Sequence, residues 1–574
     1  MSSNEKVGRL LLNNQLFPPK YIPESADVVV VSDSMWLIDE KPFNKLTLVH
    51  RILSANLYAD ENDYDRTSGF LGNTRPLEDA LKHLRAKKVK IIKLFDPLDK
   101  PLLQSVERLV KRNKMTLEVE DTPAFTETHE DLDQFLKEHP PKEKGGIRKY
   151  NHSTFYEWQR RRLKILWSSG DKPVGGKLSF DVENRDPFPP KMDKDPTVYK
   201  PNKSSSKLKE QILKVAEYVE SKYPNNPGIL FRKSSSDTDD LVERLTMYPL
   251  TNTEAKKRLG IFLKKMLPDF GKYEDAFQPG VSFGYHSVLS SSLNNGLLTP
   301  RDVLEAVQSL PGKTTRKHLP SLEGFVRQVF GWRAYCRLVY RQERQVMMRS
   351  NFLGHKRRLP ATWFQYSGDD TKNKGKSISL TNIEWLDNLL LDAQERAYAH
   401  HIIRLMVFSN WFLLNQYHPQ DVLKWFWSVV SIDAYEWVMV PNVLGMGQYA
   451  DGGIMMMRPY VSAGAYLETM SGGKVKDEDG IWTALYYGFL MKHENKIGKM
   501  YAYARSMAYI RRSSPSKKKE WKAIVKNYWK GIGKKYVPTK EAKDEVDSDD
   551  DAKRDDAEGG DDDVSKKDER KDND

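Results

Sequence analysis

The sequence predicts an α/β domain with a Rossmann-like parallel sheet, followed by a large all-α domain. Three observations support this. Apolar runs alternate with helical periodicities up to residue 145, apolar spacings of three and four recur from residue 241, and 574 residues are too many for one core. We expect an α/β domain over residues 1–145, a connector over 146–240, a helical domain over 241–537 and a charged tail over 538–574.

The first part has the pattern of alternating strands and helices. The predicted strands cover residues 8–12, 26–32, 88–95 and 115–119, with helices at 43–58, 76–86 and 100–112. This order implies a parallel sheet with helices on both faces. Ligands of such sheets lie beyond the carboxyl ends of the strands, where the sequence places Asn14, Gln15, Ser32 and Asp33. No glycine-rich dinucleotide fingerprint follows the first strand.

The connector is rich in proline, lysine, serine and glycine. One helix is expected in it, over residues 153–167, with a basic face formed by Arg160, Arg161, Arg162 and Lys164. Further on, helices are predicted over residues 303–310, 322–340, 383–412 and 421–437. The tail has too few apolar residues to offset the entropy of folding, so we expect it to be disordered.

Charge is unevenly distributed. The net charge is +13, and residues 541–574 carry 17 acidic and 7 basic groups, which is −10 and leaves +13 − (−10) = +23 for the rest. A net charge of this size on residues 1–540 favours a polyanionic partner. The single cysteine, Cys336, excludes an internal disulfide and suggests a reducing compartment. No apolar run reaches the ~18 residues of a membrane span and the start lacks a signal peptide, so we expect a soluble intracellular protein. Its compartment would be the cytoplasm or nucleoid, or in a eukaryote the nucleus or an organelle.

Five polar residues stand out in one apolar-rich region: His400, His401, Arg404, Asp433 and Asn442. Buried polar groups of this kind are costly unless a ligand or partner satisfies them. Their types and order resemble the flavin pocket of the photolyases and cryptochromes, and are closest to the bacterial iron–sulfur branch that includes prokaryotic (6-4) photolyases. Read singly, Arg404 and Asp433 could equally form a structural pair, and Asn442 could be a turn residue after a proline.

The resemblance implies that FAD is bound. Arg404 and Asp433 would stabilise the reduced ring electrostatically, and Asn442 would face its N5 atom. The residues that resemble the family's phosphate-binding segment are His286, Ser287, Leu289, Ser290 and Asn294. An ordinary capped loop is the alternative for this segment, in which Thr299-Pro300 signals a helix start.

The resemblance also implies a lesion side. His401, supported by His400, would donate a proton during repair, since histidine changes charge near neutral pH. The positions that would contact DNA or the lesion are Asp181, Arg185, Arg327, Gln328, Trp332, Leu405, Met446, Tyr460 and Tyr466. Two departures weaken the match: Ala334 replaces a glutamate, and Leu178-Ser179 replaces a Trp-Asn pair.

Three further features follow from the resemblance. Trp425, followed by Phe426, stands where the family has its inner electron-transfer pair, and Trp363 or Tyr366 falls near the outer tryptophan; core packing is the alternative. The cluster positions hold no cysteine, so we expect no metal and no iron–sulfur cluster, with Trp385 and Trp482 filling the space. The residues that would contact a 6,7-dimethyl-8-ribityllumazine antenna are Asn14, Gln15 and Asp33.

The function implied is that of a DNA lyase, a (6-4) photolyase that repairs UV-damaged double-stranded DNA in light. An electron would pass from excited, reduced FAD to a flipped-out (6-4) photoproduct. Basic and aromatic residues over 505–540 suit contact with the DNA backbone. We expect a monomer with no membrane partner. The alternatives are a cryptochrome-like blue-light photoreceptor that signals through a partner, and a flavin-free DNA-binding scaffold, which would leave the polar pocket unsatisfied.

Overall fold

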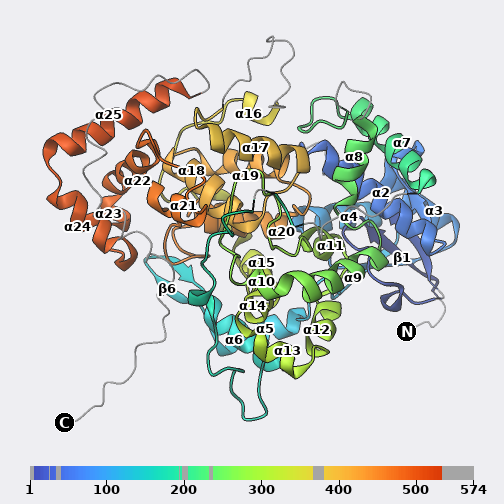
Figure 1. Ribbon diagram of the computed structural model, residues 1–574. Coiled ribbons are helices and arrows are strands. Elements are labelled where there is room, and N and C mark those ends of the chain that lie inside the picture. Colours follow the sequence, from blue (N-terminus) through green and yellow to red (C-terminus); the bar gives the residue numbers. More distant parts are fainter. Residues whose placement is uncertain are drawn as a thin grey trace.

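The computed structural model describes residues 5–24, 26–33, 41–192, 194–196, 205–231, 237–365 and 380–532 (Figure 1). The predicted tail over 538–574 and Tyr366 lie outside these residues. No helix in the described ranges combines the length and apolar character needed to cross a bilayer.

The N-terminal part is a five-stranded sheet in the order β3-β2-β1-β4-β5, with every pair parallel. The strands are β1 (Val7–Leu12), β2 (Asp27–Val31), β3 (Asp65–Thr67), β4 (Ile91–Phe95) and β5 (Thr116–Glu120). The helices are α2 (Lys45–Glu61), α3 (Pro76–Ala86), α4 (Lys100–Arg112) and α5 (His129–Glu138). The predicted parallel sheet is confirmed, while the three-residue strand β3 was missed because it is too short for a period-two pattern.

The two faces of the sheet belong to two cores. Leu10 and Leu12 of β1 pack with α3 and α4 in a local cluster, whereas Leu11 joins the large core that continues through the helical region. This alternation follows from the two-residue period of a strand. The sheet is therefore packed directly against the helical part of the molecule.

The connector contains more structure than the single helix predicted. Its elements are the antiparallel hairpin β6–β7 (Lys142–Lys144, Ile147–Lys149), α6 (His152–Leu163), a 3-10 turn at Asp181–Glu183, α7 (Ser206–Lys222) and α8 (Asp237–Thr246). Helix α7 packs on α2, with a Lys45–Glu220 ion pair of 2.6 Å between them. Buried Ile212, Val215 and Val219 mark its inner face, a helical spacing the prediction overlooked.

The predicted basic face of α6 is wrong at Arg160. This side chain is fully buried, and its guanidinium donates to the carbonyl oxygens of Ile165 (3.4 Å), Leu166 (2.6 Å) and Leu178 (2.8 Å). It therefore fastens the connector to the end of α6 and is not available on the surface.

The remainder is helical. Its α-helices are α9 (Asn252–Ile261), α10 (Leu267–Phe270), α11 (Ser290–Asn295), α12 (Pro300–Gln308), α13 (Gly312–Lys317), α14 (Leu319–Val326), α15 (Arg333–Arg349), α16 (Thr362–Gln365), α17 (Glu384–Arg396), α18 (Asn410–Leu414), α19 (Pro419–Val429), α20 (Glu436–Met439), α21 (Gly464–Met470), α22 (Ile481–Lys492), α23 (Glu494–Ile497), α24 (Ala504–Arg512) and α25 (Pro515–Gly531). Four π-helical segments join them: η4 (Phe262–Met266), η5 (Arg327–Trp332), η7 (Ile403–Ser409) and η8 (Val440–Gly447). Helix α12 begins at the predicted Thr299-Pro300 signal, with a Thr299–Asp302 capping box.

Three long predicted helices are interrupted. The one over 383–412 breaks after α17, where Ala397 adopts a left-handed φ of 53°, and helical structure resumes at His401. The one over 421–437 ends at Val429, so that Asp433 lies in a turn before α20, and the one over 322–340 contains η5. In Figure 1 the sheet domain lies on the right, and α24 and α25 lie at the opposite edge.

Candidate functional site

The centre of the candidate site is a bidentate ion pair between Arg404 and Asp433. The two guanidinium nitrogens Nη1 and Nη2 of Arg404 each lie 3.0 Å from one carboxylate oxygen of Asp433. The sequence placed these residues 29 positions apart, and the fold brings them together. Such fork-to-fork pairs are the strongest and most directional of protein ion pairs.

The turn that carries Asp433 is held by helix α2 of the sheet domain. Arg51 donates to the carbonyl oxygen of Ala434 at 2.5 Å, and the hydroxyls of Thr47 and Ser431 lie 2.8 Å apart. From the other side, Asn294 donates its amide to the Asp433 carbonyl oxygen at 2.8 Å. The sheet domain therefore positions a site carboxylate in the helical domain, and sequence reasoning missed Arg51 because it lies in an ordinary-looking helix.

Three histidines gather beside this pair. The rings of His286 and His400 stack, with centroids 4.3 Å apart and planes 18° apart. Both ring nitrogens of His400 are buried without a hydrogen-bond partner among the described residues. Desolvation lowers the pKa of His286 to about 3 and that of His400 well below its ordinary value. The stacked pair is therefore neutral.

His401 is accessible to solvent, yet protein surrounds it closely. Desolvation, with help from Arg404 and Arg327, lowers its pKa to about 4. The side chain thus lies at the surface, near the guanidinium groups of Arg404 and Arg327. At this pKa it is neutral at pH 7, and its role as a proton donor stays a prediction.

The predicted phosphate-side segment is a tight loop leading into α11. Val288 has a left-handed φ of 52°. The carboxylate of Asp195 accepts the main-chain N–H groups of Ser282 (3.1 Å), Phe283 (2.7 Å) and Gly284 (2.8 Å). Asp195 fixes the loop but carried no recognisable signal in the sequence.

Within this segment the candidate residues divide by exposure. His286, Ser287 and Ser290 are partly exposed, whereas Leu289 and Asn294 are buried. The next two hydroxyls, of Ser291 and Ser292, are buried without a partner among the described residues. Leu289 packs in the core, so its side chain contributes shape and no polar contact.

Asn442 lies in η8 and faces helix α15. Its amide nitrogen donates to the Val438 carbonyl oxygen at 2.8 Å and to the Cys336 sulfur at 3.4 Å. Burial raises the pKa of the Cys336 thiol to about 12, so the sulfur is an uncharged thiol. Because both amide hydrogens are used, the amide oxygen is the group left to face a ligand.

Arg327, predicted as a DNA or lesion contact, is enclosed by protein. It is 8% exposed and lies 2.7 Å from Asp181, 3.4 Å from Glu274 and 3.3 Å from Glu323. Asp181 also pairs with Arg185 at 3.0 Å, so neither end of the predicted DNA-reaching loop is directed away from the protein. The reason is local compensation, since buried carboxylates require a cation.

The other predicted lesion contacts are unevenly placed. Trp332 is partly exposed and stacks on His152 with ring centroids 3.6 Å apart. Tyr460 and Tyr466 are partly exposed, as is Gln328. Two predicted contacts are packed in the core: Leu405 (8% exposed) and Met446 (4% exposed).

Aromatic rings form a continuous series. The ring centroids of Trp425 and Phe412 lie 5.0 Å apart, those of Phe412 and Trp363 5.5 Å, and those of Trp363 and Trp411 5.1 Å. Trp363 is only 2% exposed, so it is not the surface end of a relay, because Trp411 and Phe412 cover it. Phe426 packs on Trp425 to one side of the series.

The rings of Trp385 and Trp482 stack with centroids 5.7 Å apart. That they fill the space of an iron–sulfur cluster, and that the protein carries no such cluster, stay predictions.

At the carboxyl edge of the sheet, the predicted antenna residues hold neighbouring loops. Asn14 donates to the carbonyl oxygen of Pro97 at 3.1 Å, and Gln15 to that of Phe95 at 2.6 Å. Asp33 accepts the Gly69 N–H, and burial raises its pKa to about 6. The amide oxygen of Asn14 is buried with no partner among the described residues, which leaves one acceptor for a ligand.

The polar groups at the centre of the site fit a flavin dinucleotide better than they fit a closed core. Arg404 retains 22% side-chain exposure beside a buried carboxylate; among the described residues, neither nitrogen of His400 has a partner, nor do two serine hydroxyls in the first turn of α11. Unsatisfied buried groups in native proteins usually have a ligand or water to satisfy them.

Fold and site together define a class of protein: a Rossmann-like sheet domain packed on a helical domain that carries a buried, cation-rich polar site. Comparison with known proteins specifies it further. A family model described as deoxyribodipyrimidine photo-lyase-related protein matches residues 57–233. A (6-4) photolyase of Agrobacterium fabrum is 32% identical over 372 residues, which cover 63% of this chain and 66% of that protein, just under two thirds of its length. The chain is thus similar to photolyase-related proteins, in agreement with the resemblance that the sequence suggested.

Other relatives are more distant or shorter. An uncharacterized protein of Acanthamoeba polyphaga mimivirus is 38% identical over 103 residues, which are 17% of this chain and 80% of that protein. The crystal structure of a bacterial class III photolyase from Agrobacterium tumefaciens has a TM-score of 0.49 and 13% identity, covering 92% of this chain and 99% of that one. A cryptochrome from Synechocystis has a TM-score of 0.48 and 12% identity, covering 91% and 95%.

Proposed function

We propose that the protein is a flavin-dependent, light-driven enzyme that repairs (6-4) photoproducts in double-stranded DNA. The observation that carries the proposal is the Arg404–Asp433 pair with three neutral histidines beside it, in a chain related to a bacterial (6-4) photolyase. The proposal includes that the protein acts as a monomer and is located in the same compartment as the DNA.

Specific residues would hold FAD. Arg404, paired with Asp433, would lie beside the ring, and Ser287, Ser290 and His286 would lie on the phosphate side. Asn442 presents its amide oxygen, because its nitrogen is held by Val438 and Cys336. A bound, reduced FAD would supply light absorption and one electron that returns after the lesion bond is cleaved.

Ligand binding can change the protonation state of His401. Desolvation and the guanidinium groups of Arg404 and Arg327 disfavour its protonated form. A phosphate or other anion bound beside them would offset those positive charges and raise the pKa of His401 toward neutrality. His401 would then carry a proton on both ring nitrogens, Nδ1 and Nε2, only when DNA is bound.

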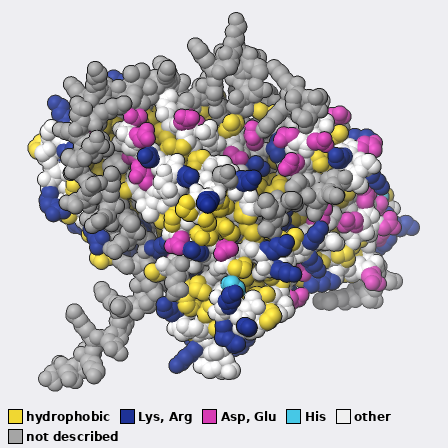
Figure 2. All heavy atoms as spheres, in the orientation of Figure 1, with side chains coloured by type: hydrophobic (Ala, Val, Ile, Leu, Met, Phe, Trp, Pro, Cys, Tyr) yellow, Lys and Arg dark blue, Asp and Glu magenta, His cyan; other side chains and the backbone are white. Residues whose placement is uncertain are grey.

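The surface supports a DNA substrate. Figure 2 shows hydrophobic side chains gathered near the middle of one face, with lysine and arginine side chains around them. Residues 1–540 carry a net +23, from +13 − (−10). Cationic surroundings bind phosphates, and an apolar centre suits unstacked bases.

Two further parts of the proposal concern other cofactors. We include a 6,7-dimethyl-8-ribityllumazine antenna, supported by the orphaned amide oxygen of Asn14. We also propose that no iron–sulfur cluster is present, supported by the Trp385–Trp482 stack and the single cysteine. Absorption spectra and iron analysis of the purified protein test both: iron at four per chain would contradict the second part.

A cryptochrome-like photoreceptor is the second candidate. It is favoured by one observation: desolvation, with Arg404 and Arg327, lowers the pKa of His401 to about 4, so that this residue is neutral at pH 7. Such a protein would bind FAD and absorb blue light but would not turn over a lesion.

One experiment separates the two. Reduced protein is illuminated with blue light in the presence of an oligonucleotide that carries a single (6-4) photoproduct, and restored thymines are measured. Repair that is lost in His401→Ala and retained in His139→Ala, an exposed histidine at the end of α5, supports the enzyme. Flavin binding without restored thymines supports the receptor, and absence of flavin contradicts both.

A further inference from the structure

Helix α25 carries an unusual row of lysines. Lys518, Lys522, Lys526 and Lys530 follow one another at intervals of four residues, so they form one ridge along the helix. Over the 12 residues from first to last the ridge is about 18 Å long at 1.5 Å per residue. The whole helix has six lysines and one glutamate, a net charge of +5.

The positive charges of this ridge are not neutralised by acidic side chains elsewhere in the described protein. None of these four lysines forms an ion pair with another described residue, and Lys522, Lys526 and Lys530 are exposed. The one acid of the helix, Glu520, pairs with Lys517 at 3.5 Å. Like charges at four-residue spacing repel one another, so an anion laid along the ridge would stabilise it.

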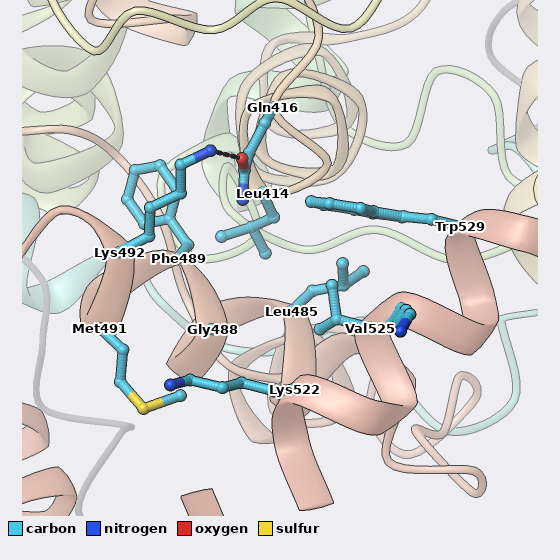
Figure 3. A pocket seen from close by; sticks show the side chains of 11 residues that line it. Leu414, Gln416, Leu485, Gly488, Phe489, Met491, Lys492, Lys522, Val525 and Trp529 are labelled. Carbon is cyan, nitrogen blue, oxygen red and sulfur yellow. Dashed lines mark hydrogen bonds between the residues drawn. The ribbon is translucent and has the colours of Figure 1, made fainter. Parts of the chain in front are cut away.

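An apolar hollow adjoins the ridge (Figure 3). It lies between α22 and α25, has a cavity volume of about 340 Å³, and is lined by Lys522, Lys526, Val525 and Trp529 on the α25 side. Leu485 and Phe489 of α22 form part of its apolar wall. Beyond them, Lys492 donates to the side-chain oxygen of Gln416. The hollow therefore combines an apolar interior with a lysine rim.

The chain itself contains a segment of matching chemistry. Residues 541–574 carry 17 acidic and 7 basic groups, a net −10, and they begin ten residues after Gly531, the last residue of α25. The stretch between them contains apolar Ile532, Tyr536 and Val537 and three lysines, Lys534, Lys535 and Lys540. We propose that the segment after α25 folds back on this helix, with Tyr536 and Val537 over the hollow and the acidic residues along the lysine ridge.

Chain length permits this path. Tyr536 follows Gly531, the last residue of α25, by five residues, which span up to about 17 Å when extended. Trp529 of the hollow lies only two residues inside the helix end. The acidic run of 34 residues is much longer than the ridge needs, so several of its acidic clusters can occupy the lysines in turn.

The docked segment would act as an internal competitor of DNA. Carboxylates and phosphates occupy the same lysines, so DNA must displace the segment before it can use this surface. This competition rests on the proposed function, whereas the docking itself does not. The consequence is a preference for tightly bound, lesion-containing sites over undamaged DNA.

Docking is tested on the full chain without DNA. A carbodiimide that joins lysine amines directly to carboxylates is applied at low salt, and the cross-links are mapped by mass spectrometry. We expect cross-links from Lys518, Lys522, Lys526 or Lys530 to residues 541–574, and their loss at high salt. A mixture of ¹⁴N- and ¹⁵N-labelled protein distinguishes links within one chain from links between two.

Matched variants give the test its control. Lys518→Gln/Lys522→Gln/Lys526→Gln should remove most cross-linking of the tail. The control Lys111→Gln/Lys137→Gln/Lys257→Gln removes the same charge from exposed lysines on α4, α5 and α9 and should leave tail cross-linking unchanged. Tyr536→Ala should lower the yield if that ring covers the hollow. Tail cross-links spread evenly over all exposed lysines, or found only between chains, would overturn the docking.

A second measurement addresses competition. The variant D549N/D550N/D551N/D561N/D562N/D563N removes six tail charges without touching the folded body. We expect it to bind undamaged duplex about tenfold more tightly at low salt, with the gain vanishing at high salt. Docking seen by cross-linking together with unchanged DNA affinity would refute the competition alone. Failure of any form to bind DNA would count against the proposed function and leave the docking result standing.

Discussion

The rings of His286 and His400 stack with centroids 4.3 Å apart, although the two residues are 114 positions apart in the chain. This contact joins the loop before α11 to the segment before η7, which carries Arg404. Neither ring is charged, since desolvation lowers both pKa values. The two stacked rings are therefore uncharged and lie beside the Arg404–Asp433 ion pair. Because they stay unprotonated in the folded protein, its stability depends on pH.

Acid should destabilise the protein through His400. The unfolded histidine binds a proton below about pH 6.5, but the folded one, with a pKa well below that, does not. The unfolded state then holds more protons, so stability falls as pH decreases from 6.5, by up to about 1.4 kcal/mol per pH unit. In urea titrations from pH 7 to 5, His400→Leu should show a shallower pH dependence than the unmodified protein. An exposed-site control, His139→Leu, should keep the original slope, and identical slopes for all three would contradict the argument.

Replacing one member of the Arg404–Asp433 pair should lower the free energy of unfolding more than replacing both. Asp433→Leu leaves a guanidinium in a largely enclosed site and should lower the free energy of unfolding by about 2 kcal/mol. The double change Arg404→Met/Asp433→Leu leaves no unpaired charge and should recover part of that loss. Urea unfolding of flavin-free protein measures the coupling, and additive losses would show that the two side chains do not interact.

Cys336 should tune a bound flavin through Asn442. With its nitrogen held by Val438 and the Cys336 sulfur, Asn442 offers its oxygen as an acceptor, which favours a protonated, reduced ring. Cys336→Val removes one anchor and should make the midpoint potential of the bound flavin more negative. Cys336→Ser retains an acceptor and should shift it less. Spectroelectrochemistry measures the potentials, and an equal shift in both variants would point to packing alone.

Removal of Arg327 should release the connector. Its guanidinium pairs with Asp181, Glu274 and Glu323, the last of which is fully buried. Arg327→Gln strands these carboxylates and should cost about 3–5 kcal/mol of stability. Limited proteolysis should then cut near residues 166–185, while Arg327→Lys, which keeps the charge, should be cut more slowly. Unchanged proteolysis in Arg327→Gln would mean that other contacts hold the loop.

Trp363 should matter to photoreduction even though it is buried. It links Phe412, which contacts Trp425, to Trp411, with ring centroids 5.5 and 5.1 Å away. Trp363→Phe should slow photoreduction of bound flavin several-fold, measured by stopped illumination in the presence of a reductant. Trp521→Phe is the control, because that buried tryptophan stacks on Tyr487 outside the series. Equal rates in both variants would assign these rings to packing.

Much of the sheet domain was predictable, because its signals are local. Helices α3 and α4 begin and end at the predicted residues, 76–86 and 100–112, where apolar periodicity coincides with an early proline. Strand β3 and helix α7 were missed for opposite reasons. The first is too short to show a period, and the second was hidden in a lysine- and serine-rich context although its buried face follows the helical spacing.

The site was predictable only in part. The Arg404–Asp433 pair came from a resemblance, since no spacing rule joins residues on either side of a broken helix. The helix ends where Ala397 adopts a left-handed conformation. Alanine rarely adopts this conformation, so nothing in the sequence signalled the break. Arg51 and Asp195, which fix the Asp433 turn and the 282–284 loop, act through long-range contacts that only the folded chain reveals. The burial of Arg327 was not predictable either, because it depends on neighbours that lie far away in sequence.

Three walls of the site are wound as π-helices: η5 with Arg327, η7 with Arg404 and η8 with Asn442. A π-helical turn arises where a helix accommodates one residue more than an α-helical turn does. Loss of a single residue from such a segment would restore α-winding there and change which of its side chains face the site, while the helix beyond it keeps its orientation. Insertions and deletions, more than substitutions, are thus the changes by which relatives of this chain could acquire a different chemistry on the same scaffold.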